Sequence, residues 1–245
     1  MISKNQIKFV RQLETKKHRQ AEGLFVAEGP KVVGDLLAVG YQPVQIFATA
    51  EWDSRNVATA SVCQITADEL RKLSFLQHPQ QVLAVFPLPS PVDVGRDVRS
   101  SLILALDGIQ DPGNLGTIIR IADWFAIDTI ICSTDTADAW SPKVVQATMG
   151  SIARVNIVYT DLKEYLSHTA LPVCGTLLDG NDIYAQELPS EAIIVMGNEG
   201  NGISQEIRQT VTHRLLIPQF RPGAESLNVA IATAITCSEF RRRRY

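Results

Sequence analysis

Residues 221–240, RPGAESLNVAIATAITCSEF, join a polar loop to a long apolar helix. Before the loop, residues 213–217 (HRLLI) resemble a strand that Pro218 ends, because proline cannot donate to a central ladder. The polar side chains of Ser226 and Asn228 therefore follow a strand, at the carboxyl edge of a sheet, where ligands bind in open α/β sheets. The alternative is that both residues only cap the helix.

The helix predicted over 227–240 is apolar on most of its circumference. A helix of this kind is buried inside its domain or against a partner chain. Upstream, strands alternate with helices from residue 101 onward, which indicates an α/β fold with a parallel sheet covered on both faces. The predicted strands are 101–106, 129–132, 155–159, 173–178, 192–196 and 215–217, and the helices are 114–126, 162–167 and one that begins at Ser141-Pro142.

The first part of the chain predicts a separate, smaller α/β module. Helices are expected over 2–20, 30–40 and 67–73, and strands over 23–27, 44–48 and 81–86. The proline-rich stretch FPLPSPVDVG then predicts a stiff, extended linker. We therefore divide the chain into a domain of residues 1–90, a linker of residues 91–98 and a domain of residues 99–245.

Composition limits the class of protein. The chain has 245 residues, 45% of them hydrophobic, with no signal-peptide core at its start and no apolar run of the about 18 residues that a membrane span needs. Its four cysteines are far apart, and with the four histidines they show no metal-ligand spacing. A reducing cytoplasm is the expected compartment, with neither membrane nor metal involved.

Basic residues are concentrated at the two ends of the chain, although the net charge is −3. Clustering of positive charge, rather than its total, creates a footprint for phosphates. The alternative is a solvated helix face and a frayed tail. The clustered residues are Lys4, Lys8, Arg11, Lys16, Lys17 and Arg19 near the start and Arg241, Arg242, Arg243 and Arg244 at the end.

Two further glycine-rich loops follow predicted strands, LDGIQDPGNLGTIIR at 106–120 and MGNEGNGIS at 196–204. Neither contains the dinucleotide fingerprint or the phosphate loop, which argues against a nicotinamide dehydrogenase and a nucleotide triphosphatase. Arg120, on the helix after the first loop, could simply form a surface salt bridge. Three strand ends that carry glycine, asparagine and a carboxylate at one sheet edge nevertheless predict one shared site.

The three loops together closely resemble the motifs of the SpoU/TrmH family of RNA ribose methyltransferases, of the SPOUT class. The matching segments are DPGNLGTIIR, MGNEGNGIS and IP followed by ESLNVA, in this order. KKHRQAEGLFVAEGPKVV near the start also resembles the family's RNA-substrate-binding domain. The loop QFRPGA at 219–224 departs from the family, whose members often have a shorter loop here, so we expect this loop to have a different shape over the ligand.

The resemblance implies a parallel-sheet SPOUT domain whose C-terminal part forms a trefoil knot, with S-adenosyl-L-methionine bound in it. It also implies methyl transfer to a ribose 2′-hydroxyl. By position in the motifs, the catalytic residues would be Arg120, Asn114, Glu199, Ser226 and Asn228. Those that bind the cofactor would be Gly197, Asn198, Glu199, Ile217 and Leu227.

The resemblance further implies a homodimer with the last helix in its interface, and RNA binding by Lys16, Lys17 and Arg19. The separate N-terminal domain favours large-subunit ribosomal RNA as the substrate. Two alternatives are a transfer-RNA ribose methyltransferase and a non-catalytic RNA-binding or ribosome-assembly protein. The intact motif residues argue against the second of these.

Overall fold

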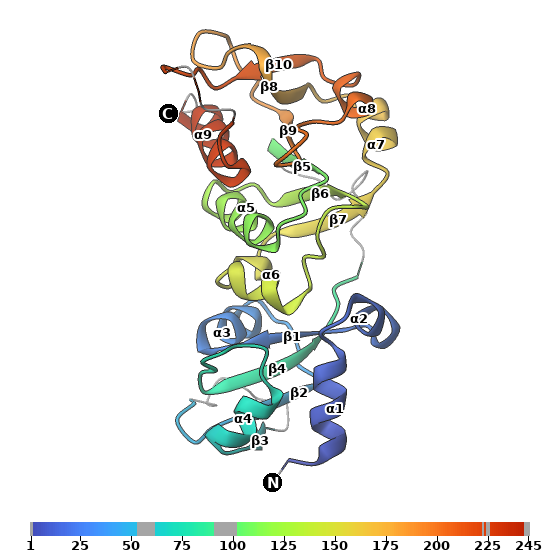
Figure 1. Cartoon of the computed structure of the whole chain (residues 1–245), viewed down its shortest axis with the longest axis vertical. Helices are drawn as coiled ribbons and strands as arrows, with labels where there is room; N and C mark the ends of the chain where they lie inside the picture. The colour runs from blue at the N-terminus through green and yellow to red at the C-terminus, as the bar shows by residue number, and fades with distance from the viewer. Residues whose placement is uncertain (1, 53–61, 91–101, 222, 224–225, 243–245) are drawn as a thin grey trace. The chain divides into compact units, whose positions relative to one another are not determined.

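The computed structural model describes residues 2–52, 62–90, 102–221, 223 and 226–242. The chain divides into two compact units (Figure 1): Met1–Ser90 with Asp138–Ala153, and Pro91–Ala137 with Arg154–Tyr245. The predicted linker at 91–98 and the motif residue Glu225 lie outside the described residues. The boundary near residue 90 therefore stays a prediction.

The first unit contains a mixed sheet with strand order β1-β4-β2-β3. β4 is antiparallel to β1 and β2, whereas β2 and β3 are parallel. Phe25, Phe47 and Phe86 are fully buried in it, as expected for aromatic residues on core-facing strand positions. Its elements are α1 (Lys4–Gln12), α2 (Lys16–Glu22), β1 (Leu24–Glu28), α3 (Pro30–Ala38), β2 (Gln45–Ala48), β3 (Val62–Gln64), α4 (Ala67–Leu73), β4 (Val82–Pro87), α6 (Pro142–Ala147) and the 3-10 helix η1 (Ser151–Ala153).

The single helix predicted over 2–20 is wrong, because two helices, α1 and α2, occupy this stretch. Leu13 ends α1 and is fully buried. The Arg19 guanidinium donates to the carbonyl oxygens of Leu13 at 2.8 Å and Glu14 at 2.6 Å. A side chain from α2 thus donates to carbonyl groups at the end of α1. In a continuous helix, backbone N–H groups of the next turn would have donated to these carbonyls.

The second unit is built on a six-stranded sheet with the order β10-β8-β9-β5-β6-β7, in which every pairing is parallel. This confirms the predicted parallel sheet. Ile, Val and Leu side chains of β5, β6 and β9 form its buried core. Its elements are β5 (Leu102–Asp107), α5 (Pro112–Trp124), β6 (Thr129–Ser133), β7 (Asn156–Thr160), α7 (Leu162–His168), β8 (Val173–Asp182), β9 (Ala192–Gly197), α8 (Gln205–Arg208), β10 (His213–Leu216) and α9 (Val229–Arg242).

The strand order reverses next to β5. From β5 the chain continues to β6 and β7 on one side, and the later strands lie on the other side, with β9 directly beside β5. A crevice for ligands opens at such a switch point, outside the carboxyl ends of the two strands. The glycine-rich loops at 106–120 and 196–204 follow β5 and β9, so the topology brings both to this place.

The last helix, α9, packs beside α5 (Figure 1). Its buried face includes Thr233 and Cys237, but Ile231 on another face is 52% exposed. Arg241 donates through Nε to the carbonyl of Phe125 at 2.7 Å and through Nη2 to that of Ala126 at 2.6 Å, which fastens the two helices at the end of α5. The predicted helix is therefore confirmed, and within this unit it is buried on one side only.

No helix among the described residues is both long and apolar enough to cross a membrane. Across the same ranges, no group of three or more His, Cys, Asp or Glu side chains is placed to hold a metal ion. The trefoil knot that the family resemblance implies stays a prediction.

Candidate active site

Three loops supply the residues that the sequence singled out. We define loop 1 as residues 108–111 between β5 and α5, loop 2 as residues 198–203 after β9, and loop 3 as residues 217–228 between β10 and α9. β5 and β9 pair along their whole length, up to Asp107 beside Gly197. Loops 1 and 2 therefore begin side by side.

Asn114 connects all three loops. Its backbone N–H donates to the Asp111 side chain at 2.8 Å, in the N-cap arrangement that begins α5 just after loop 1. Its side-chain Nδ2 donates to Glu199 Oε1 in loop 2 at 3.0 Å. Its Oδ1 accepts from Asn228 Nδ2 at the end of loop 3 at 2.9 Å. One amide therefore uses both its donor and its acceptor to join segments 85 and 114 residues away.

Asn228 caps α9 and also bonds to Asn114. Its Oδ1 accepts from the backbone N–H groups of Ala230 at 3.0 Å and Ile231 at 3.3 Å, which caps the first turn of α9. Its Nδ2 remains available for Asn114. The cap fixes the orientation of the Asn228 amide, and that amide in turn holds Asn114.

Loop 2 closes on itself, and only glycine permits this at the last residue of β9, Gly197. A Cβ on Gly197 would lie 2.2 Å from the carbonyl carbon of Gly202, far inside van der Waals contact. Asn198 and Gly202 exchange backbone hydrogen bonds at 3.0 and 2.9 Å. The Asn198 side chain also accepts from the N–H groups of Gly200 at 2.9 Å and Asn201 at 3.2 Å, and it donates to the carbonyl of Gly108 at 2.6 Å. Asn198 therefore shapes loop 2 and ties it to loop 1.

Sequence reasoning missed a set of side chains beneath these loops. The buried Asp107 carboxylate accepts from the backbone N–H of Ser204 at 2.7 Å, which fixes the end of loop 2. The Ser133 hydroxyl accepts from the N–H of Gly108 at 2.8 Å and donates to Asp135 at 2.6 Å. A carboxylate at the last position of a buried strand, as in LALD at 104–107, is the signal that could have identified Asp107.

The other predicted site residues lie at accessible positions. Ile217 is half-buried, Leu227 is 50% exposed, and Ser226 is exposed. Arg120 is exposed on α5, six residues after Asn114, and neither its guanidinium nor the Ser226 hydroxyl bonds to another described residue. The predicted surface salt bridge of Arg120 is therefore absent within the described part of the chain. Its charge is available to a ligand.

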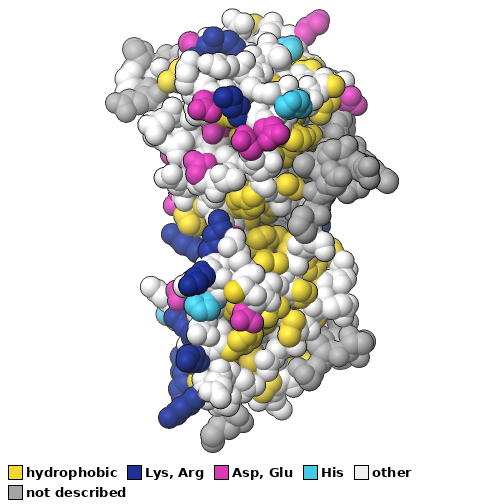
Figure 2. Space-filling model, turned by 90° about the vertical axis from the view of Figure 1, so that its right-hand side faces the viewer, with side chains coloured by type: hydrophobic (Ala, Val, Ile, Leu, Met, Phe, Trp, Pro, Cys, Tyr) yellow, Lys and Arg dark blue, Asp and Glu magenta, His cyan; other side chains and the backbone are white. Residues whose placement is uncertain are grey.

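Arg19 is not placed as an RNA contact, which corrects the sequence-based expectation. It is 2% exposed, and its guanidinium is held by two backbone carbonyls and by the carboxylate of Asp138. Lys16 and Lys17, on the same helix, are exposed. Figure 2 shows lysine and arginine side chains gathered along one edge of the first unit. The exposed basic residues of α1 and α2 are Lys4, Lys8, Arg11, Lys16 and Lys17.

The sequence model of the SpoU rRNA methylase family matches residues 101–238. The model of the MRM3-like substrate binding domain matches residues 4–84. The two matches fall on the two parts of the chain that were expected to bind cofactor and RNA.

Relatives and solved structures agree over nearly the full length. The 23S rRNA (guanosine(2553)-2'-O)-methyltransferase RlmP of Bacillus subtilis is 32% identical over 241 residues, with 95% of each chain covered. A TrmH-family protein of known structure from Porphyromonas gingivalis is 44% identical, with a TM-score of 0.91 over 99% of each chain. The AdoMet-bound rRNA methyltransferase from Sinorhizobium meliloti is 32% identical, with a TM-score of 0.89 over 100% of this chain and 97% of that one. The chain described here belongs to the SpoU rRNA methylase family.

Proposed function

We propose that this chain transfers a methyl group from S-adenosyl-L-methionine to a ribose 2′-hydroxyl of RNA, with large-subunit ribosomal RNA as the substrate. The observation that carries the proposal is the junction at Asn114, which joins the three family motifs through Glu199 and Asn228 at the switch point of the sheet. Relatives that match both parts of the chain, such as RlmP, are named for this reaction on ribosomal RNA.

The residues around loops 2 and 3 fit the methyl donor. Gly197, Gly200 and Gly202 leave bare backbone, and the accessible apolar side chains of Ile217 and Leu227 suit an adenine ring and a thioether. Asn198 and Glu199 would complete the binding set. When bound, S-adenosyl-L-methionine supplies an electrophilic methyl group and leaves as a neutral thioether. The protein therefore needs no acid at the leaving group, and its task is to align the hydroxyl and to increase its nucleophilicity.

Arg120 is the residue we assign to the nucleophile. Its guanidinium stays protonated because its ordinary pKa is above about 12, so it acts as a fixed positive charge rather than as a base. It would hold a phosphate next to the target nucleotide and stabilise the negative charge that develops on the 2′-oxygen. Asn114, Glu199, Ser226 and Asn228 would position the ribose. An exposed Arg120 whose guanidinium makes no hydrogen bond or ion pair with another described residue supports this role.

The experiment that tests the assignment compares Arg120→Ala with Arg208→Ala. Arg208 pairs with Asp179 in the same unit and serves as the control for losing an accessible arginine. We expect Arg120→Ala to bind S-adenosyl-L-methionine normally by calorimetry but to slow methyl transfer by about 10²–10³-fold, the range for one charge-stabilising donor. Near-normal turnover in Arg120→Ala would remove the residue from the reaction.

We propose a homodimer with α9 in its interface. Leu227 and Ile231 are 50% and 52% exposed, and Trp124 at the end of α5 is 84% exposed, although α5 and α9 are neighbours. Leu227 and Ile231 lie near the start of α9 and Trp124 lies at the end of α5, so exposed apolar side chains occur at both ends of this helix pair, which supports an interaction surface along it. We also propose a cytoplasmic location, in keeping with four free cysteines, three of them buried.

A further inference from the structure

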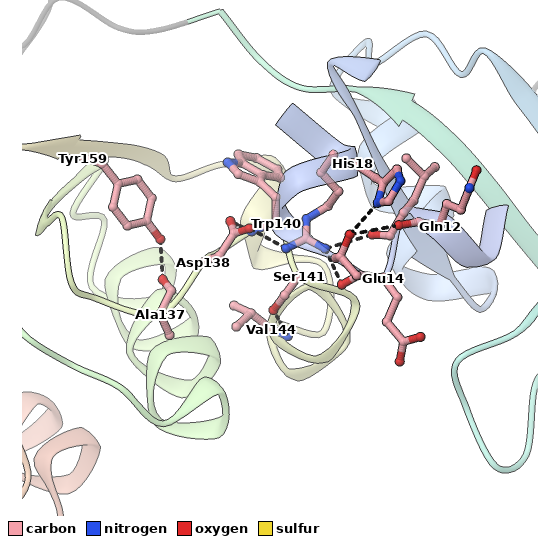
Figure 3. Close-up of polar contacts among 12 residues, drawn as sticks. Gln12, Glu14, His18, Ala137, Asp138, Trp140, Ser141, Val144 and Tyr159 are labelled. Atoms are coloured by element: carbon pink, nitrogen blue, oxygen red, sulfur yellow. Dashed lines mark hydrogen bonds and ion pairs between the residues drawn. The ribbon is translucent and has the colours of Figure 1, made fainter. Parts of the chain in front are cut away.

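The chain passes from the second unit to the first at the peptide bond between Ala137 and Asp138, and both residues are held by hydrogen bonds. Ala137 is held in the second unit at both of its backbone groups. Its N–H donates to the carbonyl of Ile109 in loop 1 at 2.8 Å. Its carbonyl accepts from the hydroxyl of Tyr159 at the end of β7 (Figure 3).

The next residue, Asp138, is held in the first unit. Its Oδ2 accepts from Arg19 Nη2 at 2.5 Å, and its Oδ1 accepts from the backbone N–H of Trp140 at 3.0 Å (Figure 3). The two side chains of the ion pair are 3% and 16% exposed. A pair this deeply buried is only weakly screened by water and ions. Because Arg19 is part of α2, a displacement of this helix would therefore also displace Asp138.

Another residue of the segment 138–153, Trp140, also packs against the first unit. The ring of Trp140 contacts the ring of Phe25 on β1, with centroids 4.7 Å apart. The segment ends at Ala153, and the next residue, Arg154, is fixed in the second unit by hydrogen bonds of 2.7–3.1 Å to Asp123 on α5. The segment 138–153, between β6 and β7, thus packs in the first unit. The residues on either side of it, Ala137 and Arg154, are hydrogen-bonded within the second unit.

Loop 1 connects the junction between Ala137 and Asp138 to loop 2. Ile109, the partner of Ala137, follows Gly108, whose carbonyl accepts from Asn198 Nδ2 at 2.6 Å. Asn198 in turn holds the N–H groups of loop 2. An unbroken series of hydrogen bonds and short covalent steps therefore runs from Arg19 through Asp138 and Ala137 to loop 2.

We propose that the Arg19–Asp138 pair is a positioning element that couples RNA binding on α2 to the geometry of loops 1 and 2. The inference rests on the proposed function. Lys16 and Lys17 lie within one turn of Arg19 on α2. A phosphate bound there acts on the same short helix that holds Asp138. The proposed path consists of packed, hydrogen-bonded residues, which can carry energetic coupling between two sites.

The first test keeps the pair and loosens the junction. A Gly-Gly dipeptide is inserted between Ala137 and Asp138, and the control carries the same insertion between Ser190 and Glu191, in an exposed turn before β9. We expect the junction insertion to leave the affinities for S-adenosyl-L-methionine and for RNA unchanged but to slow single-turnover methyl transfer by at least about tenfold, because misplaced groups react slowly. Equal transfer rates for the two insertions and the wild type would overturn the proposal.

The second test does not depend on activity. It compares Asp138→Asn, which weakens the buried pair, with Asp68→Asn, which weakens the exposed Asp68–Arg71 pair of the same unit. We expect Asp138→Asn alone to speed hydrogen exchange at the amides of Gly108 and Gly200 in the second unit. Unchanged exchange at these amides would show that the Arg19–Asp138 pair affects only the first unit, and it would overturn the proposed coupling. A wild-type protein that methylates no RNA would instead contradict the proposed function and leave this readout intact.

Discussion

Asn114 is the residue on which the site depends most. Both ends of its amide are bonded, because Nδ2 donates to Glu199 and Oδ1 accepts from Asn228. Replacement by alanine would release loops 2 and 3 from the start of α5 at the same time. The backbone cap by Asp111 would remain, so α5 itself should still form.

We therefore predict that Asn114→Ala lowers the rate of methyl transfer by about 10²-fold because the loops are no longer aligned, with a smaller effect on melting temperature. Asn201→Ala is the matched control, since Asn201 lies exposed in loop 2 and its backbone N–H, not its side chain, is bonded there. Single-turnover transfer measures both variants. If the two variants react equally fast, the Asn114 junction has no part in alignment.

Glu28 provides a test of electrostatics away from the site. It is 5% exposed at the end of β1, and its carboxylate accepts from the Ser74 hydroxyl and from the N–H of Phe75 at 2.9 Å. Burial raises the pKa of Glu28, and the hydrogen bonds and the nearby Arg11 oppose that rise only in part.

The folded protein thus holds the Glu28 proton more tightly than the unfolded chain. Glu28 contributes most stability below its ordinary pKa and loses that contribution as the pH rises through the raised value. Glu28→Gln, which cannot ionise, should gain in melting temperature relative to the wild type as the pH rises from acid to neutral. Glu14→Gln, at an exposed position, is the control. A gain that shrinks over this pH range would refute the sign of the shift.

At the scale of single residues, three of the side chains that the sequence placed in one site are bonded to one another, whereas the roles of other residues were not predicted. Asn114, Glu199 and Asn228 were identifiable because each lies in a motif next to a strand end. Arg19 was misassigned because a count of charges cannot show which carbonyls at the end of α1 need a donor. Asp107 was missed because its importance depends on a partner, Ser204, 97 residues away.

Among the elements, α9 leads to the most specific prediction, which concerns the dimer interface. Its packing on α5 leaves Ile231 exposed, and the proposed dimer would cover this face. We predict that Ile231→Asp converts the protein to a monomer in sedimentation velocity without changing its fold, because a charge in an apolar interface is left unpaired.

Leu178→Asp is the control for this test, since Leu178 is 77% exposed on β8 and its replacement should not alter the assembly. A wild-type protein that sediments as a monomer at every concentration would contradict the interface. So would an Ile231→Asp variant that still dimerises as well as Leu178→Asp.

Long buried strands were easier to predict than the break between two helices or the shortest elements. Continuous Val, Ile and Leu runs predicted β5, β6 and β9, because strands buried on both faces have no polar alternation. β3 and α8 were missed, since segments of three and four residues are too short to show a periodicity. Near the break between α1 and α2, Arg19 bonds to Asp138, 119 residues away, and local propensity contains no information about such a contact.

For the molecule as a whole, charge distribution leads to a prediction about RNA. Lys16 and Lys17 are exposed, whereas the net charge of the chain is −3. Lys16→Ala/Lys17→Ala should weaken RNA binding and reduce the slope of log affinity against log salt by about 0.7 for each phosphate that the protein no longer neutralises. Lys163→Ala, which removes a lysine paired with Glu206 in the second unit, is the control. An unchanged slope would remove α2 from the RNA surface.

The division of the molecule was the hardest feature to predict. Sequence reasoning takes domains as continuous, and residues 99–245 stay the predicted methyltransferase domain. In the structure, Asp138–Ala153 groups with the first unit, through contacts such as Trp140 on Phe25 that join residues more than a hundred positions apart. Such pairings have no local signature.

The most direct test of the proposed function locates the methyl group. Purified protein is incubated with methyl-labelled S-adenosyl-L-methionine and unmodified large-subunit ribosomal RNA, with transfer RNA in parallel, and the RNA is hydrolysed in alkali. A methylated 2′-hydroxyl cannot attack the neighbouring phosphate, so we predict that the label survives in an alkali-resistant dinucleotide from ribosomal RNA. Label in transfer RNA alone would make that RNA the substrate. Label in single nucleotides, or none in either RNA despite bound S-adenosyl-L-methionine, would contradict ribose methylation of RNA by this protein.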